Sequence, residues 1–172
     1  SYCPDFEVTT VDGQTVKMSE LLEGKEALCV VEFATWCGPC EQEFPMMDKV
    51  YQKYQDKLAM IAILVDPLDD EKGGKEYADS HNFSFPIAMG NDTLKDITSS
   101  SYPTILIIDR NGKIGVHKVG KIADEETFEK VVTTFMGDDY AERQLAYYTF
   151  TAYSGARPAA GTEFTITSEE EL

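Results

Sequence analysis

Histidine, arginine and long apolar runs are the shortages of this 172-residue sequence. Its two histidines, His81 and His117, do not stand at the spacing of paired ligands, which argues against a zinc centre. A membrane-spanning helix needs roughly 18 or more consecutive apolar residues, and no such stretch occurs. The sequence therefore predicts neither a resident metal ion nor a membrane-spanning helix.

Positive charge is also in short supply. Asp and Glu number 31 against 15 Lys and Arg, giving a formal net charge of −16. This sign argues against nucleic acid or an anionic membrane surface as a partner. A solvated acidic surface is the simplest interpretation, and a preference for basic protein substrates is the alternative. With 42% hydrophobic residues, the chain is long enough for one domain with a sizeable core.

Two of the four cysteines form the motif Trp36-Cys37-Gly38-Pro39-Cys40. An apolar run precedes the motif and an amphipathic segment follows it, so the pair lies where a buried strand gives way to a helix. Cys-x-x-Cys at such a junction is either a redox or a metal arrangement. The shortage of further ligands favours the redox interpretation.

Electrostatics also favours the redox interpretation of the two cysteines. A helix that begins just after Cys37 points its unpaired N–H groups and positive dipole end at that sulfur. This stabilises the thiolate, which is the attacking species in disulfide exchange. Pro39 costs little in a first helical turn, and Gly38 keeps the approach to Cys37 open. The sequence therefore predicts Cys37 as the nucleophile and Cys40, one turn further on and less exposed, as the resolving thiol.

Hydrophobic periodicity predicts an α/β protein whose central mixed sheet is flanked by helices. An N-terminal hairpin is expected to turn at Asp12-Gly13, and a short helical turn to begin with Ser19 as its N-cap. An acidic loop is expected at 66–74. The other expected strands are 27–34, 58–65, 85–89, 103–109 and 113–119, and the expected helices are 41–57 with a kink at Pro45, 75–82, 92–97 and one from Asp124.

The character of the chain changes near residue 137. Residues 1–136 are predicted to form the domain, and 137–172 an acidic extension with seven acids and two arginines. Alternation at 147–153 and 162–167 predicts either an appended hairpin or a tail that orders on a partner. The last residues, 168–172, are expected to be disordered.

The motifs together resemble thioredoxins, and more closely the extracytoplasmic TlpA/ResA branch of that fold, which is related to the AhpC/TSA redoxins. The resemblance covers residues 3–136. Two departures are Cys3, where the family usually has alanine, and Glu32, where an apolar residue is usual. The matching pieces, in order, are Cys3-Pro4-Asp5-Phe6, Phe33-Ala34-Thr35-Trp36, Glu43-Phe44-Pro45, Tyr102-Pro103-Thr104 and 108–114.

The resemblance implies a cis peptide bond before Pro103, in a loop beside the active cysteines that pairs with the substrate chain. It places Tyr102 against both the disulfide and the substrate. The residues alone leave a trans proline that opens a strand as the alternative. The substrate-binding residues implied in this way are Trp36, Gly38, Pro39, Tyr102, Pro103 and Thr104.

Glu43 shares a helical face with Cys40, three residues before it. The family has a functional glutamate at this position, so the resemblance implies that Glu43 takes the proton of Cys40. From the residues alone, a solvated helical glutamate is an equal alternative.

Glu32 is a charge in a predicted central strand, and strand alternation places it on the face opposite to Val31. A buried charge needs a partner, and the expectation is a structural pairing with a lysine such as Lys17, Lys25 or Lys118; a functional role is the alternative.

The two cysteines outside the motif have no motif of their own. Cys29 is expected to be a small buried residue of the strand. A Cys3–Cys29 disulfide is the alternative, since an exported protein can keep one.

The resemblance thus implies an extracytoplasmic thiol–disulfide oxidoreductase that reduces protein disulfides with no cofactor besides the Cys37–Cys40 disulfide. Its expected partners are protein thiols and disulfides, apocytochrome c among them, and a membrane electron donor, but no nucleic acid. Membrane anchoring through a removed N-terminal segment is a further expectation.

Two other classes remain open. A thiol peroxidase on the same fold would need an arginine beside its reactive cysteine, and the three arginines (Arg110, Arg143 and Arg157) are all distant in sequence from the cysteines. A metal chaperone or binding module, which grips its partner with residues 138–172, is the non-enzymatic alternative.

Overall fold

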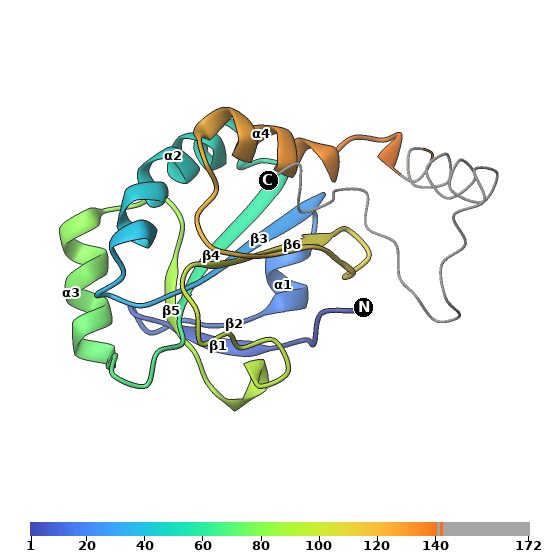
Figure 1. The fold of residues 1–172 in the computed structure, drawn as a ribbon. Helices are drawn as coiled ribbons and strands as arrows, with labels where there is room; N and C mark the ends of the chain where they lie inside the picture. Colours follow the sequence, from blue (N-terminus) through green and yellow to red (C-terminus); the bar gives the residue numbers. More distant parts are fainter. Residues whose placement is uncertain (141, 143–172) are drawn as a thin grey trace.

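The computed structural model describes residues 1–140 and 142 (Figure 1). The hairpin and strand predictions at 147–153 and 162–167, and the disorder expected at 168–172, lie outside the described residues. In chain order the elements are β1 (Glu7–Thr10), β2 (Thr15–Lys17), α1 (Met18–Leu22), β3 (Ala27–Phe33), α2 (Gly38–Tyr54), β4 (Leu58–Leu64), α3 (Glu71–His81), β5 (Ile87–Met89), the 3₁₀ turn η1 (Asp92–Leu94), β6 (Thr104–Asp109), β7 (Ile114–Val119) and α4 (Glu125–Thr134).

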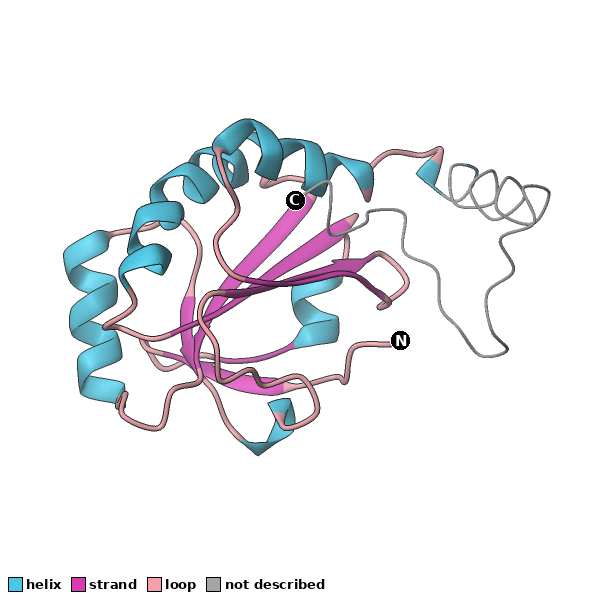
Figure 2. Ribbon diagram, viewed as in Figure 1, coloured by secondary structure: helices cyan, strands magenta, loops and turns pink. Residues whose placement is uncertain are grey.

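One mixed sheet of seven strands joins the described residues, in the order β2-β1-β5-β4-β3-β6-β7. The parallel pairs are β3 with β4 and β4 with β5, while β1, β2, β6 and β7 run antiparallel to their neighbours. Figure 2 shows the strands crossing the centre of the molecule, with helices packed around them. The predicted α/β class with a central mixed sheet and an N-terminal hairpin is confirmed.

The sheet has a hydrophobic core on each face, and alternation along β3 assigns its residues to one or the other. Ala27, Cys29, Val31 and Phe33 face the larger core, which α2, α3 and α4 cover. Leu28 and Val30 face the smaller core, which receives Met18 of α1 and Phe6. Because β3 is covered on both faces, all seven of its residues are buried, as expected of a central strand in a layered α/β fold.

Three helix boundaries differ from the predictions because local caps decide them. α1 begins at Met18 with Lys17 as its N-cap, two residues before the predicted N-cap Ser19: Oε1 of Glu20 accepts the N–H of Lys17, and Ser19 instead hydrogen-bonds Asp5. α2 begins at Gly38 and continues through Pro45 to Tyr54.

α3 begins at Glu71, inside the predicted loop, because Asp70 caps it by accepting the N–H of Gly73 at 2.7 Å. Gly74 lies where a Cβ atom would meet Leu64 Cδ1 at 2.9 Å. The glycine that reads as a loop signal is therefore required by the close approach of α3 to β4. The predicted helix at 92–97 is only the 3₁₀ turn η1.

The residues that follow α4 are held against the sheet by hydrogen bonds. The hydroxyl of Tyr140 donates to Oδ2 of Asp109 at 2.9 Å, and the side chain of Tyr140 is 1% exposed. The N–H of Gly137 donates to Oε1 of Glu26 at 2.7 Å, and Arg110 donates to the carbonyl of Gly137. Asp109 pairs with Ala27 at the start of β3, so these contacts lie at the end of the sheet away from Cys37.

Candidate active site

The disulfide lies where the chain passes from the end of β3 to the start of α2. Cys37 is the N-cap of α2, and its Sγ accepts a hydrogen bond from the N–H of Cys40 at 3.2 Å. Cys37 and Cys40 are bonded to each other, with Cα atoms 5.3 Å apart. The predicted strand-to-helix junction is present, so the positive end of the α2 dipole lies at the sulfur of Cys37.

Exposure differs between the two sulfurs and the residues around them. Cys37 is 5% exposed and Cys40 is fully buried, while Gly38 and Pro39 between them lie at the surface. A Cβ atom on Gly38 would meet nothing within 4 Å. Approach to the disulfide is therefore over Gly38 and Pro39, along the side of Cys37.

The loop before β6 carries the Tyr102–Pro103 peptide bond, which is cis, as the resemblance implied. Trp36 packs edge-on against Tyr102 with ring centroids 5.8 Å apart, so this loop lies beside the motif. Trp36 is 62% exposed: it borders the site rather than covering the sulfurs. The carbonyl of Pro103 accepts the N–H of Gly120 at 2.7 Å, which fixes the loop to the end of β7.

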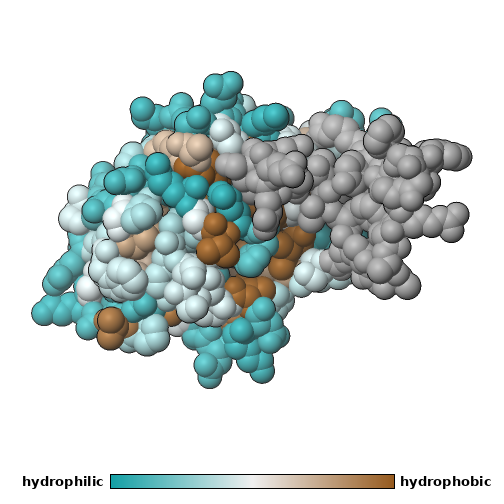
Figure 3. Space-filling model, viewed as in Figure 1, coloured by the Kyte–Doolittle hydropathy of each residue, from teal (hydrophilic) through white to brown (hydrophobic). Residues whose placement is uncertain are grey.

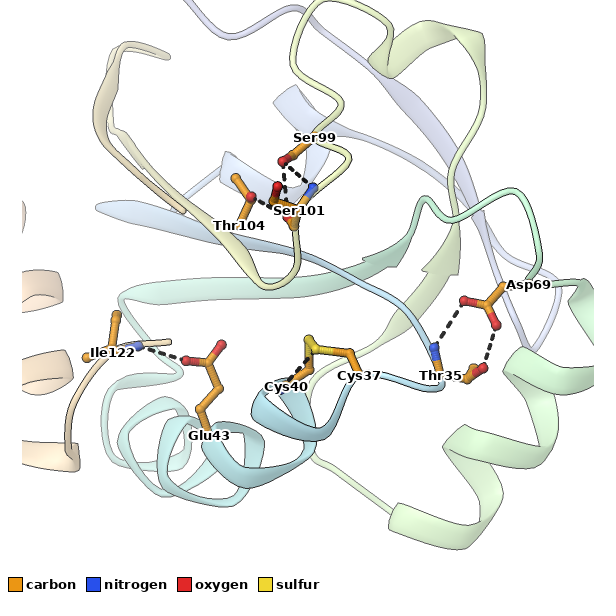
Figure 4. Close-up of a disulfide and its surroundings, with 9 residues drawn as sticks. All are labelled: Thr35, Cys37, Cys40, Glu43, Asp69, Ser99, Ser101, Thr104 and Ile122. Atoms are coloured by element: carbon orange, nitrogen blue, oxygen red, sulfur yellow. Dashed lines mark hydrogen bonds between the residues drawn. A yellow bond between two sulfur atoms is a disulfide. The ribbon is translucent and has the colours of Figure 1, made fainter. Parts of the chain in front are cut away.

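A chain of short hydrogen bonds stiffens the same loop. The hydroxyl of Thr104 donates to the carbonyl of Ser101 at 2.8 Å, and that carbonyl also accepts the hydroxyl of Ser99 at 3.0 Å (Figure 4). Thr104 itself is fully buried. The buried side chain of Thr104 therefore stabilises the conformation of the loop through its hydrogen bond to Ser101. Tyr102, which is half-buried, lies at the surface of the loop.

Glu43 lies one turn of α2 beyond Cys40 and is fully buried. Its Oε2 accepts the N–H of Ile122 at 3.0 Å, and its Oε1 is buried without a partner among the described residues. Burial raises the pKa of Glu43 to about 7, against the opposing effects of the Ile122 N–H and of Lys121 and Lys118. Figure 4 shows the carboxyl group pointing from α2 toward the sheet, beside the disulfide. The carboxyl group one turn of α2 beyond Cys40 thus has a pKa close to neutral.

Asp69 is a member of the site that the sequence did not reveal. Its Oδ2 accepts the N–H of Thr35 at 3.0 Å, and its Oδ1 accepts the hydroxyl of the same residue. Figure 4 shows this pair on the side of the motif away from Glu43. The acidic run at 66–71 was the available signal, but nothing local assigns its carboxylates to a residue 34 positions earlier.

Asp66 connects the same loop to Tyr102. Burial and the neighbouring Asp66 carboxylate raise the pKa of the Tyr102 hydroxyl to about 12. The β4–α3 loop, residues 65–70, is therefore attached to both sides of the site, through Asp69 at Thr35 and through Asp66 at Tyr102.

Glu32 is buried on the opposite face of the sheet, as strand alternation predicted. The expected lysine partner is wrong: within residues 1–140 and 142, no lysine forms an ion pair with Glu32, and Lys25 donates to the carbonyl of Gln55 instead. Oε1 of Glu32 accepts the N–H of Ser99 at 3.2 Å, and Oε2 is buried without a partner in this part of the chain. Burial raises the pKa of Glu32 to about 8. The group avoids an unpaired charge by holding its proton.

The two remaining cysteines are free and buried, Cys29 in the larger core and Cys3 in the smaller one. The alternative of a Cys3–Cys29 disulfide is wrong because the sheet separates the two side chains. Burial raises the pKa of both thiols, that of Cys3 to about 12.

Within the described residues, no group of three or more His, Cys, Asp or Glu side chains could hold a metal ion. No helix of that part of the chain is long and apolar enough to cross a membrane. His81, one of the two histidines, lies against Glu41 at 2.5 Å and stacks on Tyr77.

A Cys-x-x-Cys disulfide at the start of a helix, beside a cis-proline loop on a mixed sheet, defines a thioredoxin-fold protein. Comparison with known proteins gives the family. Residues 1–117 match the AhpC/TSA family model, and the chain belongs to that family as a thiol–disulfide oxidoreductase of the ResA-like type.

The individual proteins that this chain resembles support the same family assignment. The thioredoxin-like protein YneN of Bacillus subtilis is 35% identical over 130 residues, which cover 74% of this chain and 75% of YneN. The thiol-disulfide oxidoreductase ResA of Bacillus cereus is 32% identical over 130 residues, 74% of this chain and 71% of ResA. A crystal structure of a thiol:disulfide interchange protein of the thioredoxin family from Chlorobium tepidum superposes with a TM-score of 0.66 at 26% identity, covering 80% of this chain and 97% of that one.

Proposed function

We propose that this protein reduces disulfide bonds of other proteins outside the cytoplasm, with Cys37 and Cys40 as its working dithiol. The observation that carries the proposal is the placement of Cys37 as N-cap of α2, beside the cis Tyr102–Pro103 loop and with Glu43 next to Cys40. The names of the relatives, thiol-disulfide oxidoreductase and thiol:disulfide interchange protein, support the type of reaction.

The reaction begins from the dithiol. The Cys37 thiolate attacks one sulfur of the substrate disulfide, forms a mixed disulfide and releases the other substrate sulfur as a thiolate. Cys40 then loses its proton and attacks Sγ of Cys37, which releases the second substrate thiolate. Two electrons have moved to the substrate, and the Cys37–Cys40 disulfide present in the structure is the oxidised product.

Glu43 is the base of the second step in this proposal. Cys40 is fully buried in the disulfide form, and the buried carboxyl group of Glu43, one turn further along α2, supports this assignment. A pKa of about 7 suits that exchange at neutral pH, because the carboxylate and the acid are then both populated.

Substrate contacts are assigned to the residues around Cys37. Trp36, Gly38 and Pro39 form the exposed side of the motif, and Tyr102, which precedes the cis bond to Pro103, packs against Trp36 from the loop. Thr104 acts through the loop, because its hydroxyl is occupied by Ser101.

The dithiol must be restored by a reductant, for which we propose a membrane protein dithiol as electron donor. The likeness to the TlpA/ResA branch supports this donor and the extracytoplasmic location, and it makes the cysteines of apocytochrome c a substrate to test. The acidic surface, with a net charge of −16, supports protein partners rather than nucleic acid.

Among the described residues, 1–140 and 142, the single arginine is Arg110, and its position does not support a peroxidase function. This arginine contacts Gly137 and lies over the ring of Tyr140, at the end of the sheet away from Cys37. It cannot stabilise the leaving oxygen of a peroxide at that sulfur.

The test is reduction of insulin disulfides by the full chain with a chemical dithiol as electron source. We expect turnover by the wild type, none by Cys37→Ser, and accumulation of a mixed disulfide in Cys40→Ser, seen by mass spectrometry under non-reducing conditions. A Cys37–Cys40 potential near about −270 mV marks a reductant, and one near about −120 mV an oxidant. Absence of insulin turnover in the wild type would contradict the proposal.

A further inference from the structure

A few carboxyl side chains are buried in the described part of the chain, although charge lies mainly at the surface. On the face drawn in Figure 3, the surface is largely hydrophilic and hydrophobic residues form small patches. The buried carboxyl groups belong to Glu32, Glu43, Asp48 and Asp109. Asp48 and Asp109 each accept at least three hydrogen bonds. Glu32 accepts one, from Ser99, so its burial needs a different explanation.

Glu32 is paired with Thr104 across β3 and β6, so the two side chains lie next to each other on one face of the sheet. Both reach the segment that precedes β6. Oε1 of Glu32 accepts the N–H of Ser99 at 3.2 Å, and the hydroxyl of Thr104 donates to the carbonyl of Ser101 at 2.8 Å (Figure 4). Two adjacent side chains of the sheet thus hold the two ends of segment 99–101.

This segment is hydrogen-bonded within itself and leads directly into the active-site loop. The hydroxyl of Ser99 donates to the carbonyl of Ser101 at 3.0 Å, and the N–H of Ser101 donates to Oγ of Ser99 at 3.0 Å. Tyr102, which packs against Trp36, is the next residue, and Pro103 follows it. A displacement of Ser99 is therefore transmitted through Ser101 to the loop beside the motif.

No positive charge compensates the carboxyl group of Glu32 within residues 1–140 and 142. The ionisable side chains that interact with it electrostatically are Cys3 and Tyr102, which carry no positive charge in either protonation state. β4 and β6 place Ile63 and Thr104 beside it in the sheet, and neither ionises. The charged residues of the segments that cover this face are exposed: Asp5, Lys17, Glu20, Asp92, Lys95 and Asp96.

Loss of the Glu32 proton would therefore leave an unpaired charge inside the protein, which is costly unless water reaches it. Burial raises the pKa of Glu32 to about 8, because the interior favours the neutral acid. Segment 99–101 separates the carboxyl group from solvent: Ser99 is half-buried, and Ser100 and Ser101 are exposed. Hydration of the carboxylate therefore requires this segment to move.

We propose that Glu32 is a positioning residue for disulfide exchange: its uncharged carboxyl group holds Ser99, and loss of its proton to solvent loosens the loop before Pro103 and weakens the binding of polypeptide substrates. The inference rests on the proposed reduction of protein disulfides and adds a pH control of substrate binding. Glu32 acts on the loop from the face of the sheet opposite to Cys37, and Glu43 acts on the thiols from the other face.

The test is a single turnover of the pre-reduced full chain with excess insulin, quenched with acid and followed by chromatography of the released chains. The wild type is compared with Glu32→Gln, whose amide oxygen can accept the Ser99 N–H but whose side chain cannot ionise. Insulin and Cys37 are common to both, so the ratio of the two proteins isolates Glu32. We expect equal half-saturating insulin concentrations at about pH 7, and a wild-type value about tenfold higher at about pH 9, with the same limiting rate.

Two further variants separate the hydrogen bond from the charge. Glu32→Val removes the acceptor, so it should raise the half-saturating concentration about fivefold at every pH, the range of one hydrogen bond, without a further rise above pH 8. Thr104→Val removes the other anchor and keeps the carboxyl group, so it should raise the same quantity and retain the pH dependence. Glu7→Gln, at an exposed glutamate of β1, is the matched control.

Every variant should exchange with the small disulfide 5,5′-dithiobis(2-nitrobenzoate) at the wild-type rate at each pH, and circular dichroism should show each to be folded. A wild type that matches Glu32→Gln at about pH 9, or a difference in the limiting rate alone, would overturn the positioning role and leave the proposed function standing. Failure of the wild type to reduce insulin at neutral pH would overturn the proposed function and this inference with it.

Discussion

Ile122 donates its backbone N–H to Oε2 of Glu43 at 3.0 Å, and this bond joins the loop before α4 to the carboxyl group one turn of α2 beyond Cys40. The bond orients one oxygen and leaves the other, Oε1, buried and without a partner among the described residues. Such an oxygen can receive a proton from a neighbouring thiol. The arrangement leads to the first prediction.

Glu43→Gln should keep the bond to Ile122 but lose the base. We expect the resolution step, measured by stopped-flow after forming the mixed disulfide, to slow by about 100-fold. In the wild type this rate should rise as pH passes about 7, because the carboxylate is the active form. The variant should lack that rise. Glu126→Gln, exposed on α4, is the control; an unchanged pH profile in Glu43→Gln would remove Glu43 from the mechanism.

Glu32 should make the protein less stable as pH rises. Its pKa is raised from 4.5 to about 8, so the folded state keeps a proton that the unfolded state has lost. Its favourable contribution is complete below about pH 4.5 and disappears as pH passes about 8. Glu32→Gln should therefore be more stable than the wild type at pH 9, by about 2 kcal/mol, and nearly equal at pH 4.5. Urea unfolding at the two pH values measures this, with exposed Glu76→Gln as control.

Gly115 on β7 should not tolerate a methyl group. A Cβ atom there would lie 2.2 Å from Cε1 of Phe135, which is fully buried and cannot turn into solvent. We expect Gly115→Ala to lower the free energy of unfolding by about 1–3 kcal/mol through overpacking. Gly38→Ala, where nothing lies within 4 Å, should change it by less than about 0.5 kcal/mol. Equal stability of the two variants would contradict the packing of Phe135 on β7.

Tyr140→Phe should destabilise the domain although it keeps the ring. The hydroxyl donates to the buried carboxylate of Asp109 at 2.9 Å, and its removal should cost about 1–2 kcal/mol in chemical denaturation. Tyr2→Phe, at a residue 65% exposed, is the matched control. A loss of stability in Tyr140→Phe alone would show that the folded unit extends past residue 136.

The strands and the motif were the predictable part of this fold. The apolar runs of β3, β4 and β6 fix their burial on both faces, and Cys37 to Cys40 marks the strand-to-helix junction whatever surrounds it. The face of Glu32 followed from alternation alone. These features depend on residues that are close in sequence, so the local pattern of apolar and polar residues is enough to predict them.

The missed features depend on contacts between distant segments. Asp69 belongs to the site because it reaches Thr35, and one oxygen of Glu32 accepts the N–H of Ser99, 67 residues away, rather than pairing with a lysine. The early start of α3 required knowing that Gly74 packs against Leu64, which turns an apparent loop signal into a packing requirement. Hydrophobic periodicity carries no information about contacts between segments that are distant in sequence. The roles of Glu43 and the cis-proline loop remain predictions, although the structure brings both to the disulfide.

The burial of Cys3 and Cys29 on opposite faces of the sheet has a practical consequence for redox work. Burial raises the pKa of both thiols, so near neutral pH an alkylating reagent should modify them far more slowly than the thiolate that reduction produces at Cys37. One added group then marks a reduced Cys37–Cys40 pair. A native mass spectrum of such a sample therefore reports the redox state of the Cys37–Cys40 pair, without substitution of Cys3 or Cys29.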